Sequence, residues 1–160
     1  MRKNIFLALL LVALLSFNAY ALDTTLLNMR NKFFSESLKL KDVFPKSKDM
    51  ILLVVMWDSC LNTTSQLDGY FYMLGIFNTI KEENLTEDAI SFLSGWLREI
   101  RKTAEMNLSS LKASTGKFEP DTKVHLAILK DYFAELIKKV DLEAGKISTL
   151  RASVKKKTAQ

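Results

Sequence analysis

The chain has 160 residues, of which 48% are hydrophobic and 26% charged, the composition of an ordinary globular protein. It contains one cysteine and one histidine. These numbers exclude an intrachain disulfide, a Cys₂His₂ or Cys₄ zinc site and a c-type haem attachment motif. The formal net charge is +5, from 23 basic and 18 acidic residues.

The first 21 residues have the three parts of a secretory signal peptide. Arg2 and Lys3 are followed by an apolar stretch from Ile5 to Phe17, and Ala19-Tyr20-Ala21 places small residues at both positions that determine cleavage. The apolar stretch is shorter than the roughly 20 residues that a transmembrane anchor needs. We therefore predict cleavage before Leu22. The short leader is of a bacterial type, so the expected location is the periplasm or outside the cell.

Removal of the leader changes the charge distribution, because it carries two basic residues and no acidic one. Four of the remaining cations are Arg151, Lys155, Lys156 and Lys157, which leaves residues 22–150 close to neutral. Nucleic-acid binding requires cations spread over a surface, so no nucleic-acid partner is predicted. The three lysines allow at most a weak contact with an anionic membrane surface.

Apolar residues of the mature chain recur every three or four positions, which indicates helices. The first predicted helix spans residues 23–44. Its apolar positions gather near one face: Leu26, Phe33, Leu40 and Phe44, with Leu27, Phe34 and Leu38 beside them. Pro45 ends this helix, because proline disfavours helical geometry in the residue before it. Ser47 is the predicted N-cap of the next helix.

Residues 47–82 allow two interpretations. The apolar runs 50–57 and 70–77 could each be a buried strand, but one helical stripe continues through the polar middle: Val54, Trp57, Leu61, Thr64, Leu67, Phe71 and Leu74. We predict a single long helix, with residues 62–69 as the place where a kink would fall. Because its ends are apolar nearly all round, we expect it to be the most buried element.

The third and fourth helices have clearer boundaries. Thr86 is the predicted N-cap of the third helix, and Gly116 the predicted left-handed residue that stops it. Pro120 suits the first turn of the fourth helix. The third helix carries the stripe Ala89, Leu93, Trp96, Leu97, Ile100, Ala104, Leu108 and Leu111. The fourth carries Val124, Ile128, Tyr132, Leu136, Val140, Ile147, Leu150 and Val154.

The predicted connections, at residues 44–46, 82–85 and 114–119, are short, and short loops make successive helices antiparallel neighbours. The predicted fold is therefore an all-α, antiparallel, up-and-down four-helix bundle with a shorter first helix. It forms a single domain at residues 22–154, after the signal peptide at 1–21 and before a basic tail at 155–160.

Cys60 is the one candidate nucleophile. An apolar run that leads into a Trp and a Cys is similar to thioredoxin-like proteins, but Thr63 stands where the second cysteine of C-x-x-C would be. We predict a buried cysteine that packs as a small apolar residue. A thiol-dependent redox enzyme that uses Cys60 is kept as an alternative.

His125 is the one candidate imidazole ligand. Bundles of the cytochrome b562 type hold haem between a Met early in the first helix and a His late in the last. Met29 is early here, but His125 lies near the start of its helix. No metal, haem or other cofactor is predicted. Asp121 and His125 are four residues apart and are expected to form a solvated pair.

Aromatic residues in the middle of the chain are the remaining candidates for a binding surface: Trp57, Tyr70, Tyr72 and Trp96. Successive helix positions differ by about 100°, so at least one residue of 70–72 must point away from the core. We predict a non-enzymatic exported bundle that binds a protein partner or a cell-envelope component. A carrier or sensor for a small apolar molecule is a second alternative.

Gly75 and Gly95 each interrupt an apolar stripe and lie ten residues on either side of Leu85. An antiparallel hairpin centred there brings them to a similar depth. We therefore predict a close approach of the two helices at this level, beside Trp96.

The first testable prediction concerns the leader. The intact mass of the protein recovered from the producing cells should correspond to a chain that begins at Leu22. A mass that retains residues 1–21 would contradict the signal peptide.

Overall fold

The computed structural model describes residues 24–80 and 86–158, and all of their regular structure is helical. The elements in chain order are α2 (Thr24–Val43), the 3₁₀ helix η1 (Phe44–Lys46), α3 (Met50–Thr79), α4 (Glu87–Ala113) and α5 (Pro120–Thr158). No strand occurs among these residues, so the all-α prediction is confirmed. The predicted signal peptide lies outside the described residues.

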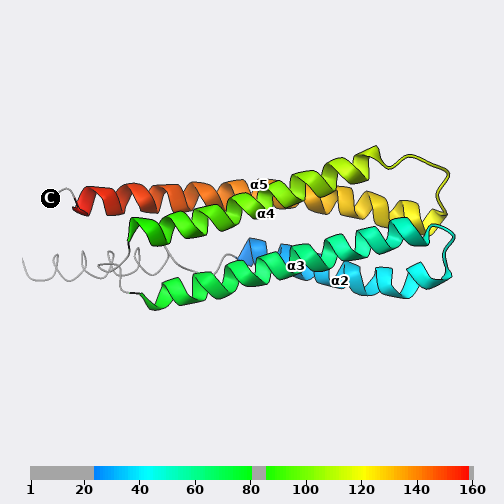
Figure 1. Ribbon diagram of the computed structural model, residues 1–160, viewed down its shortest axis with the longest axis horizontal. Helices are drawn as coiled ribbons and strands as arrows, with labels where there is room; N and C mark the ends of the chain where they lie inside the picture. The colour runs from blue at the N-terminus through cyan, green and yellow to red at the C-terminus, as the bar shows by residue number, and fades with distance from the viewer. Residues whose placement is uncertain (1–23, 81–85, 159–160) are drawn as a thin grey trace, which may run out of the picture.

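The four α-helices form two antiparallel hairpins, α2–α3 and α4–α5, that lie along each other (Figure 1). Packing is most extensive within each hairpin, while α2 with α5 and α3 with α4 join the hairpins, and α3 also meets α5 across the centre. At 20 residues α2 is the shortest of the four, as predicted. The bundle predicted from loop lengths is thus supported by the helix contacts.

The α2–α3 and α4–α5 turns meet at one end of the bundle, at the right of Figure 1. Ser47 Oγ donates to Glu119 Oε2 at 2.5 Å, and Asp49 Oδ2 accepts from the backbone N–H of Glu119 at 2.7 Å. The backbone N–H of Lys48 also donates to Glu119 Oε2, at 3.2 Å. These reciprocal hydrogen bonds fix the two hairpins at the same level.

Two of the predicted helix termini are confirmed and two are wrong. Thr86 accepts from the backbone N–H of Ala89 at 3.2 Å as the N-cap of α4, and α5 begins at Pro120. The N-cap of α3 is Asp49; Ser47 instead accepts from the N–H of Asp49 at 3.0 Å. Gly116 does not adopt positive φ, because α4 ends earlier, at an extended Ser114.

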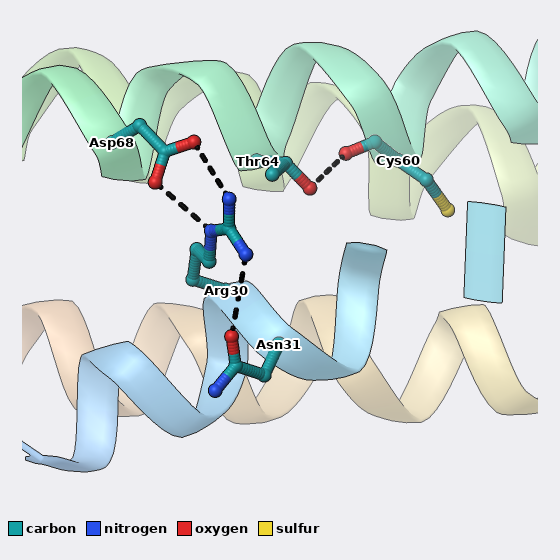
Figure 2. Close-up of polar contacts among 5 residues, drawn as sticks. All are labelled: Arg30, Asn31, Cys60, Thr64 and Asp68. Carbon is teal, nitrogen blue, oxygen red and sulfur yellow. Dashed lines mark hydrogen bonds and ion pairs between the residues drawn. The ribbon is translucent and has the colours of Figure 1, made fainter. Parts of the chain in front are cut away.

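Helix α3 is continuous through residues 62–69, the predicted place for a kink. The hydroxyls of Thr63 and Thr64 donate to the carbonyls four residues before them, those of Ser59 and Cys60, both at 2.8 Å. Figure 2 shows the bond from Thr64 to Cys60. Both hydroxyls are therefore satisfied within the helix, and neither side chain needs a break in the backbone.

The predicted core face is correct for α4 but rotated for α3 and for the first half of α5. In helix α3 the predicted Thr64, Leu67 and Leu74 are buried, but at the other four predicted positions the buried residue is the preceding one. The buried residues are Leu53, Met56, Cys60, Thr63, Thr64, Leu67, Tyr70, Leu74 and Phe77. Helix α5 buries Leu126, Leu129 and Phe133, while Val124 is exposed. Because α3 is apolar on more than one side, hydrophobicity alone does not determine which side is covered.

Helix α2 differs from the prediction in a similar way. Phe34 and Leu38, expected beside the core, are exposed, whereas Glu36 and Ser37 are buried. Phe33 packs on Phe133 of α5 with ring centroids 4.8 Å apart. Glu36 lies three residues after Phe33, on the same side of the helix, and therefore faces α5, whereas Leu38 points to solvent.

Ion pairs join neighbouring helices at the surface. Arg30 of α2 donates from Nε and Nη2 to both carboxylate oxygens of Asp68 on α3, at 2.9 and 3.1 Å (Figure 2). Hydrogen bonding to Asp68 raises the pKa of Arg30. Lys32–Glu135 links α2 to α5 at 2.6 Å, and Arg101–Asp141 links α4 to α5 at 2.7 Å. Each of these exposed pairs contributes little to the free energy of folding. All three are compatible with the same alignment of the helices along the bundle axis.

The predicted approach at Gly75 and Gly95 is wrong, since a Cβ atom at either position would meet nothing within 4 Å. The close approach is at Gly69, where the indole ring of Trp96 lies against the α-carbon. Trp96 Nε1 donates to the carbonyl of Gln66 at 3.0 Å and holds the ring in this position. The missing side chain of Gly69 thus allows α4 to pack on α3.

The second testable prediction compares two glycines of α3. Gly69→Ala should reduce the free energy of unfolding by about 1–3 kcal/mol relative to Gly75→Ala, because the new methyl group must displace the hydrogen-bonded indole. Gly75→Ala is the matched control, since it adds a methyl group to the same helix in open space. Urea unfolding measures both. Equal stabilities of the two variants would show that Trp96 does not pack on Gly69.

Candidate functional site

The four aromatic residues predicted to bind a partner do not form one surface. Tyr70 is fully buried and donates from Oη to Glu143 Oε1 of α5 at 2.9 Å. Trp57 is half-buried beside Phe44 of η1, with ring centroids 5.8 Å apart. Tyr72 is 71% exposed, which confirms that one residue of 70–72 points outward. Of the four, Tyr72 and the half-buried Trp96 are the two that the α3–α4 packing brings near each other.

Helix α3 leaves large apolar side chains in solvent, in contrast to the prediction that it is the most buried element. We call six residues the α3 face: Met50, Ile51, Val55, Tyr72 and Ile76 of the helix, and Ile80, the C-cap residue that follows it. At 100° per residue they lie within a sector of about 140°. Exposed Asp58, Asn62 and Ser65 separate the first three from the last three. The α3 face therefore consists of one apolar patch near each end of the helix.

A groove of about 470 Å³ lies along α4, with one lining residue, Gln66, from α3. We call it the α4 groove, and it is lined by Gln66, Phe92, Gly95, Trp96, Arg98, Glu99 and Ile100. The rings of Phe92 and Trp96 lie 5.9 Å apart and form its aromatic wall. No atom within 4 Å would meet a Cβ at Gly95, so the groove is open at that point.

The α4 groove and the patch of Tyr72 lie at the same level of the bundle. Trp96 packs on Gly69, Phe92 precedes Trp96 by one turn, and Tyr72 follows Gly69 by about one turn. Because α3 and α4 are antiparallel, these steps run in the same direction. The aromatic wall and the exposed patch are therefore neighbours.

The α4 groove has three polar residues in its lining, of which Gln66 is the one from α3 and Arg98 and Glu99 are from α4. Gln66 Nε2 donates to Thr103 Oγ1 at 3.2 Å, whereas Gln66 Oε1 is buried and accepts no hydrogen bond from the described residues. A second hollow, of about 480 Å³, lies between α2 and α5 and has a different character. Its lining is mainly polar: Thr25, Asn28, Asn31, Lys32, Ser35, Tyr132, Glu135 and Lys139.

A buried polar pair joins α2 to α5 in the core. His125 Nδ1 donates to Glu36 Oε1 at 2.6 Å, and Glu36 Oε2 also lies 3.2 Å from Lys39 Nζ. Glu36 is fully buried and His125 is 9% exposed. The prediction of a solvated Asp121–His125 pair is therefore wrong. The physical reason is the rotation of α5, which turns His125 with Leu126 and Leu129 toward α2.

Sequence reasoning missed Glu36, although its position carried a signal. Glu36 follows Phe33 by three residues and precedes Leu40 by four, which places it on the apolar stripe of its helix. A charged residue on such a stripe requires a partner from another helix. With one histidine in the chain, His125 was the natural candidate for that partner.

Cys60 is a free cysteine that is completely buried, as predicted. Burial raises the pKa of its thiol from 9.0 to about 12, and the carboxylate of Glu36 adds to the shift. Figure 2 shows its sulfur turned away from the Arg30–Asp68 pair. A catalytic thiol needs the opposite environment, one that is exposed and lowers the pKa.

Within residues 24–80 and 86–158, no three His, Cys, Asp or Glu side chains converge in a way that could hold a metal ion. None of the helices in these ranges is long and apolar enough to cross a membrane. Comparison with protein-family models, with curated proteins and with solved structures finds no match.

The third testable prediction follows from the pKa of Cys60. Above pH 9 the thiol of the unfolded chain loses its proton while the folded thiol keeps it until about pH 12. Stability should therefore fall between pH 9 and pH 11, by about 1.4 kcal/mol per pH unit from this group. Below pH 9 both states hold the proton, and this group contributes no pH dependence.

The measurement is urea unfolding of the protein and of Cys60→Ala at pH 8, 9, 10 and 11. As the pH rises above 9, the free energy of unfolding of the unsubstituted protein should fall relative to that of Cys60→Ala. Parallel curves would mean that the thiol ionises equally in both states, and hence that it is not buried.

Proposed function

We propose that this protein is an exported, non-enzymatic helical bundle that binds a protein partner of the bacterial cell envelope through the α3 face. The proposal combines the predicted signal peptide with one structural observation: the long, apolar helix α3 is packed against α2 and α4, but one of its sides faces solvent with large apolar side chains. Residues 22–154 would form the binding domain. The lysines at 155–157 would add at most a weak contact with a membrane surface.

The exposed side of α3 is the main support. A helix that is apolar all round is normally buried all round, because each exposed large apolar side chain forgoes about 1.5–3 kcal/mol of burial free energy. Tyr72, Ile76 and Ile80 follow one another at intervals of four residues, so they form a continuous ridge. Such a ridge fits the apolar side of another helix or sheet better than it fits a small molecule.

Aromatic residues beside the ridge strengthen the case for a protein partner. Tyr72 is exposed, and Phe92 and Trp96 form the adjoining wall of the α4 groove. Tyr and Trp supply much of the binding free energy at protein interfaces, since they bury large areas at a small entropic cost. Among the four aromatic residues predicted from sequence, we therefore assign Tyr72 and Trp96 to this surface.

The α4 groove itself supports a second candidate function. Its volume of about 470 Å³ falls within the range of small-molecule sites, and one wall is aromatic. A small apolar ligand could bind beside Trp96. A redox function of Cys60 gains no support, because the thiol is buried and its pKa is raised.

The fourth testable prediction uses a photo-reactive phenylalanine analogue, placed at Tyr72 or at Leu142, in the producing cells. Leu142 of α5 is the matched control, because it is 64% exposed and lies outside the α3 face. Cross-linking at position 72 should yield a discrete protein adduct, and position 142 should not. Adding Ile76→Asp should abolish the adduct without loss of helical circular dichroism.

The specificity of the adduct decides between the candidates. Purified unlabelled protein should compete for the adduct, whereas its Ile76→Asp variant should not. Adducts with lipid alone would indicate a membrane-surface protein. Equal adducts at both positions, or an adduct that Ile76→Asp leaves intact, would contradict a partner site on the α3 face.

A further inference from the structure

The end of the bundle where the two turns meet exposes large apolar side chains. We call residues 41–55 and 112–124 the turn end. Ile51, in the first turn of α3, is 80% exposed, more than any other large apolar residue that the structure describes. Met50 beside it is 49% exposed, and Val55, one turn later, is 51% exposed. Val124, near the start of α5, is 55% exposed.

The turn end also carries exposed cations from both hairpins. Its lysine side chains form no ion pair with the described residues, whereas Lys39, just outside the turn end, pairs with Glu36. The lysines are Lys41, Lys46, Lys48, Lys112, Lys117 and Lys123, and all six are exposed. Their charges are therefore available to an external surface.

The four acidic residues of the turn end offset these charges only in part. The side chains of Asp49 and Glu119 are engaged in the hydrogen bonds that join the two turns. Asp42 and Asp121 line one small hollow, of about 270 Å³, together with Lys46. The outer surface of the turn end is therefore positive.

The apolar residues of the two hairpins lie at similar levels along the bundle. Asp49 and Glu119 are hydrogen-bonded to each other, and α3 and α5 both run away from this end (Figure 1). At 1.5 Å per residue, Val55 lies about 9 Å beyond Asp49 and Val124 about 8 Å beyond Glu119. Ile51 lies closer to the tip than either valine.

From this combination we infer that the turn end docks on a membrane surface that contains anionic lipid. Ile51 enters the headgroup region, and the lysines lie beside the lipid phosphates. Interfacial proteins bury apolar side chains about 5–10 Å deep in this region and bind more strongly where cations meet anionic lipid. Exposed Asp58 lies about 10 Å beyond Ile51 along α3, and so it stays outside the lipid.

A membrane accounts for both features of the turn end at once. A soluble polyanion would pair with the lysines but would leave Ile51 in water. A purely apolar surface would cover Ile51 but would also desolvate the lysines, which is costly for unpaired charges. A layer of phosphate groups above hydrocarbon offers each of them a suitable contact.

This inference goes beyond the proposed function and does not depend on it. Ile51 belongs to the α3 face, but the support for a protein partner comes from the ridge of Tyr72, Ile76 and Ile80 near the other end of α3. Ile51 and Tyr72 lie about 32 Å apart along the helix. A bundle that stands on its turn end therefore keeps the ridge clear of the lipid, and the two patches of the α3 face have different occupants.

The first test measures the binding of the purified, natively processed protein to vesicles by sedimentation. The protein should bind phosphatidylcholine vesicles that contain about one third phosphatidylglycerol, and not vesicles of phosphatidylcholine alone. Binding should weaken as NaCl rises from about 0.1 M to about 0.5 M. Ile51→Asp should weaken it at least about tenfold, whereas Leu142→Asp should not, because Leu142 is 64% exposed but lies far along α5 from the turn end.

The second test removes charges from the turn end. Lys48→Gln combined with Lys117→Gln should weaken binding to the anionic vesicles at least about tenfold, since each lysine near an anionic surface contributes to binding. Lys102→Gln combined with Lys138→Gln is the matched control, because it removes the same charge from exposed positions in the middle of α4 and α5. Circular dichroism confirms that each variant keeps its helices.

The third test places a polarity-sensitive fluorophore on Ile51→Cys. The native Cys60 is completely buried, so the new cysteine is labelled selectively. Emission should shift to shorter wavelength when anionic vesicles are added. The same label on Leu142→Cys should not respond.

The inference would be overturned by a protein that does not bind the anionic vesicles, or that binds neutral ones equally well. It would also be overturned by an Ile51→Asp variant that binds like the unsubstituted protein, or by equal losses in the two double lysine variants. The vesicle experiments contain no protein partner. Their failure therefore leaves the cross-linking prediction at Tyr72 in place, and a failure of the cross-linking leaves the membrane inference in place.

Discussion

The buried hydrogen bond between Glu36 and His125 is the constraint on which the closure of the bundle depends. It joins the first and last described helices, whose residues are 89 positions apart, at a distance of 2.6 Å. A buried carboxylate without a partner costs several kcal/mol, so α2 and α5 can meet only where the two side chains face each other. The Phe33–Phe133 contact and the Lys32–Glu135 ion pair agree with that alignment.

This alignment also decides which side of α3 is covered. Arg30, less than two turns before Glu36 on α2, pairs with Asp68 of α3. The charge of Glu36 also raises the pKa of Cys60 on α3. Helix α2 therefore covers the side of α3 that carries Cys60 and Asp68. Trp96, which packs on Gly69, places α4 on another side. The remaining side of α3 faces solvent although it carries an apolar patch near each end, and the proposed partner surface follows from these exposed apolar residues.

The sequence predicts the helices well because local signals determine them: Thr86 caps α4, Pro120 begins α5, and the short turns impose antiparallel packing. Which face each helix buries is harder to predict. Helix α3 is apolar in several directions, and the choice depends on contacts from distant segments. For the same reason the sequence does not predict that Gly69, rather than Gly75, accommodates Trp96. The relative position of two packed helices along the bundle axis depends on both helices together.

The most direct test of this account is a double-mutant cycle on the buried pair, measured by urea unfolding. His125→Leu leaves the Glu36 carboxylate buried with only Lys39 beside it, and should cost about 3–5 kcal/mol. Glu36→Leu should cost less, and the double Leu variant should be more stable than His125→Leu alone, because no unpaired charge then remains. Additive costs below about 0.5 kcal/mol for each variant would show that the two side chains do not pair and would contradict the account.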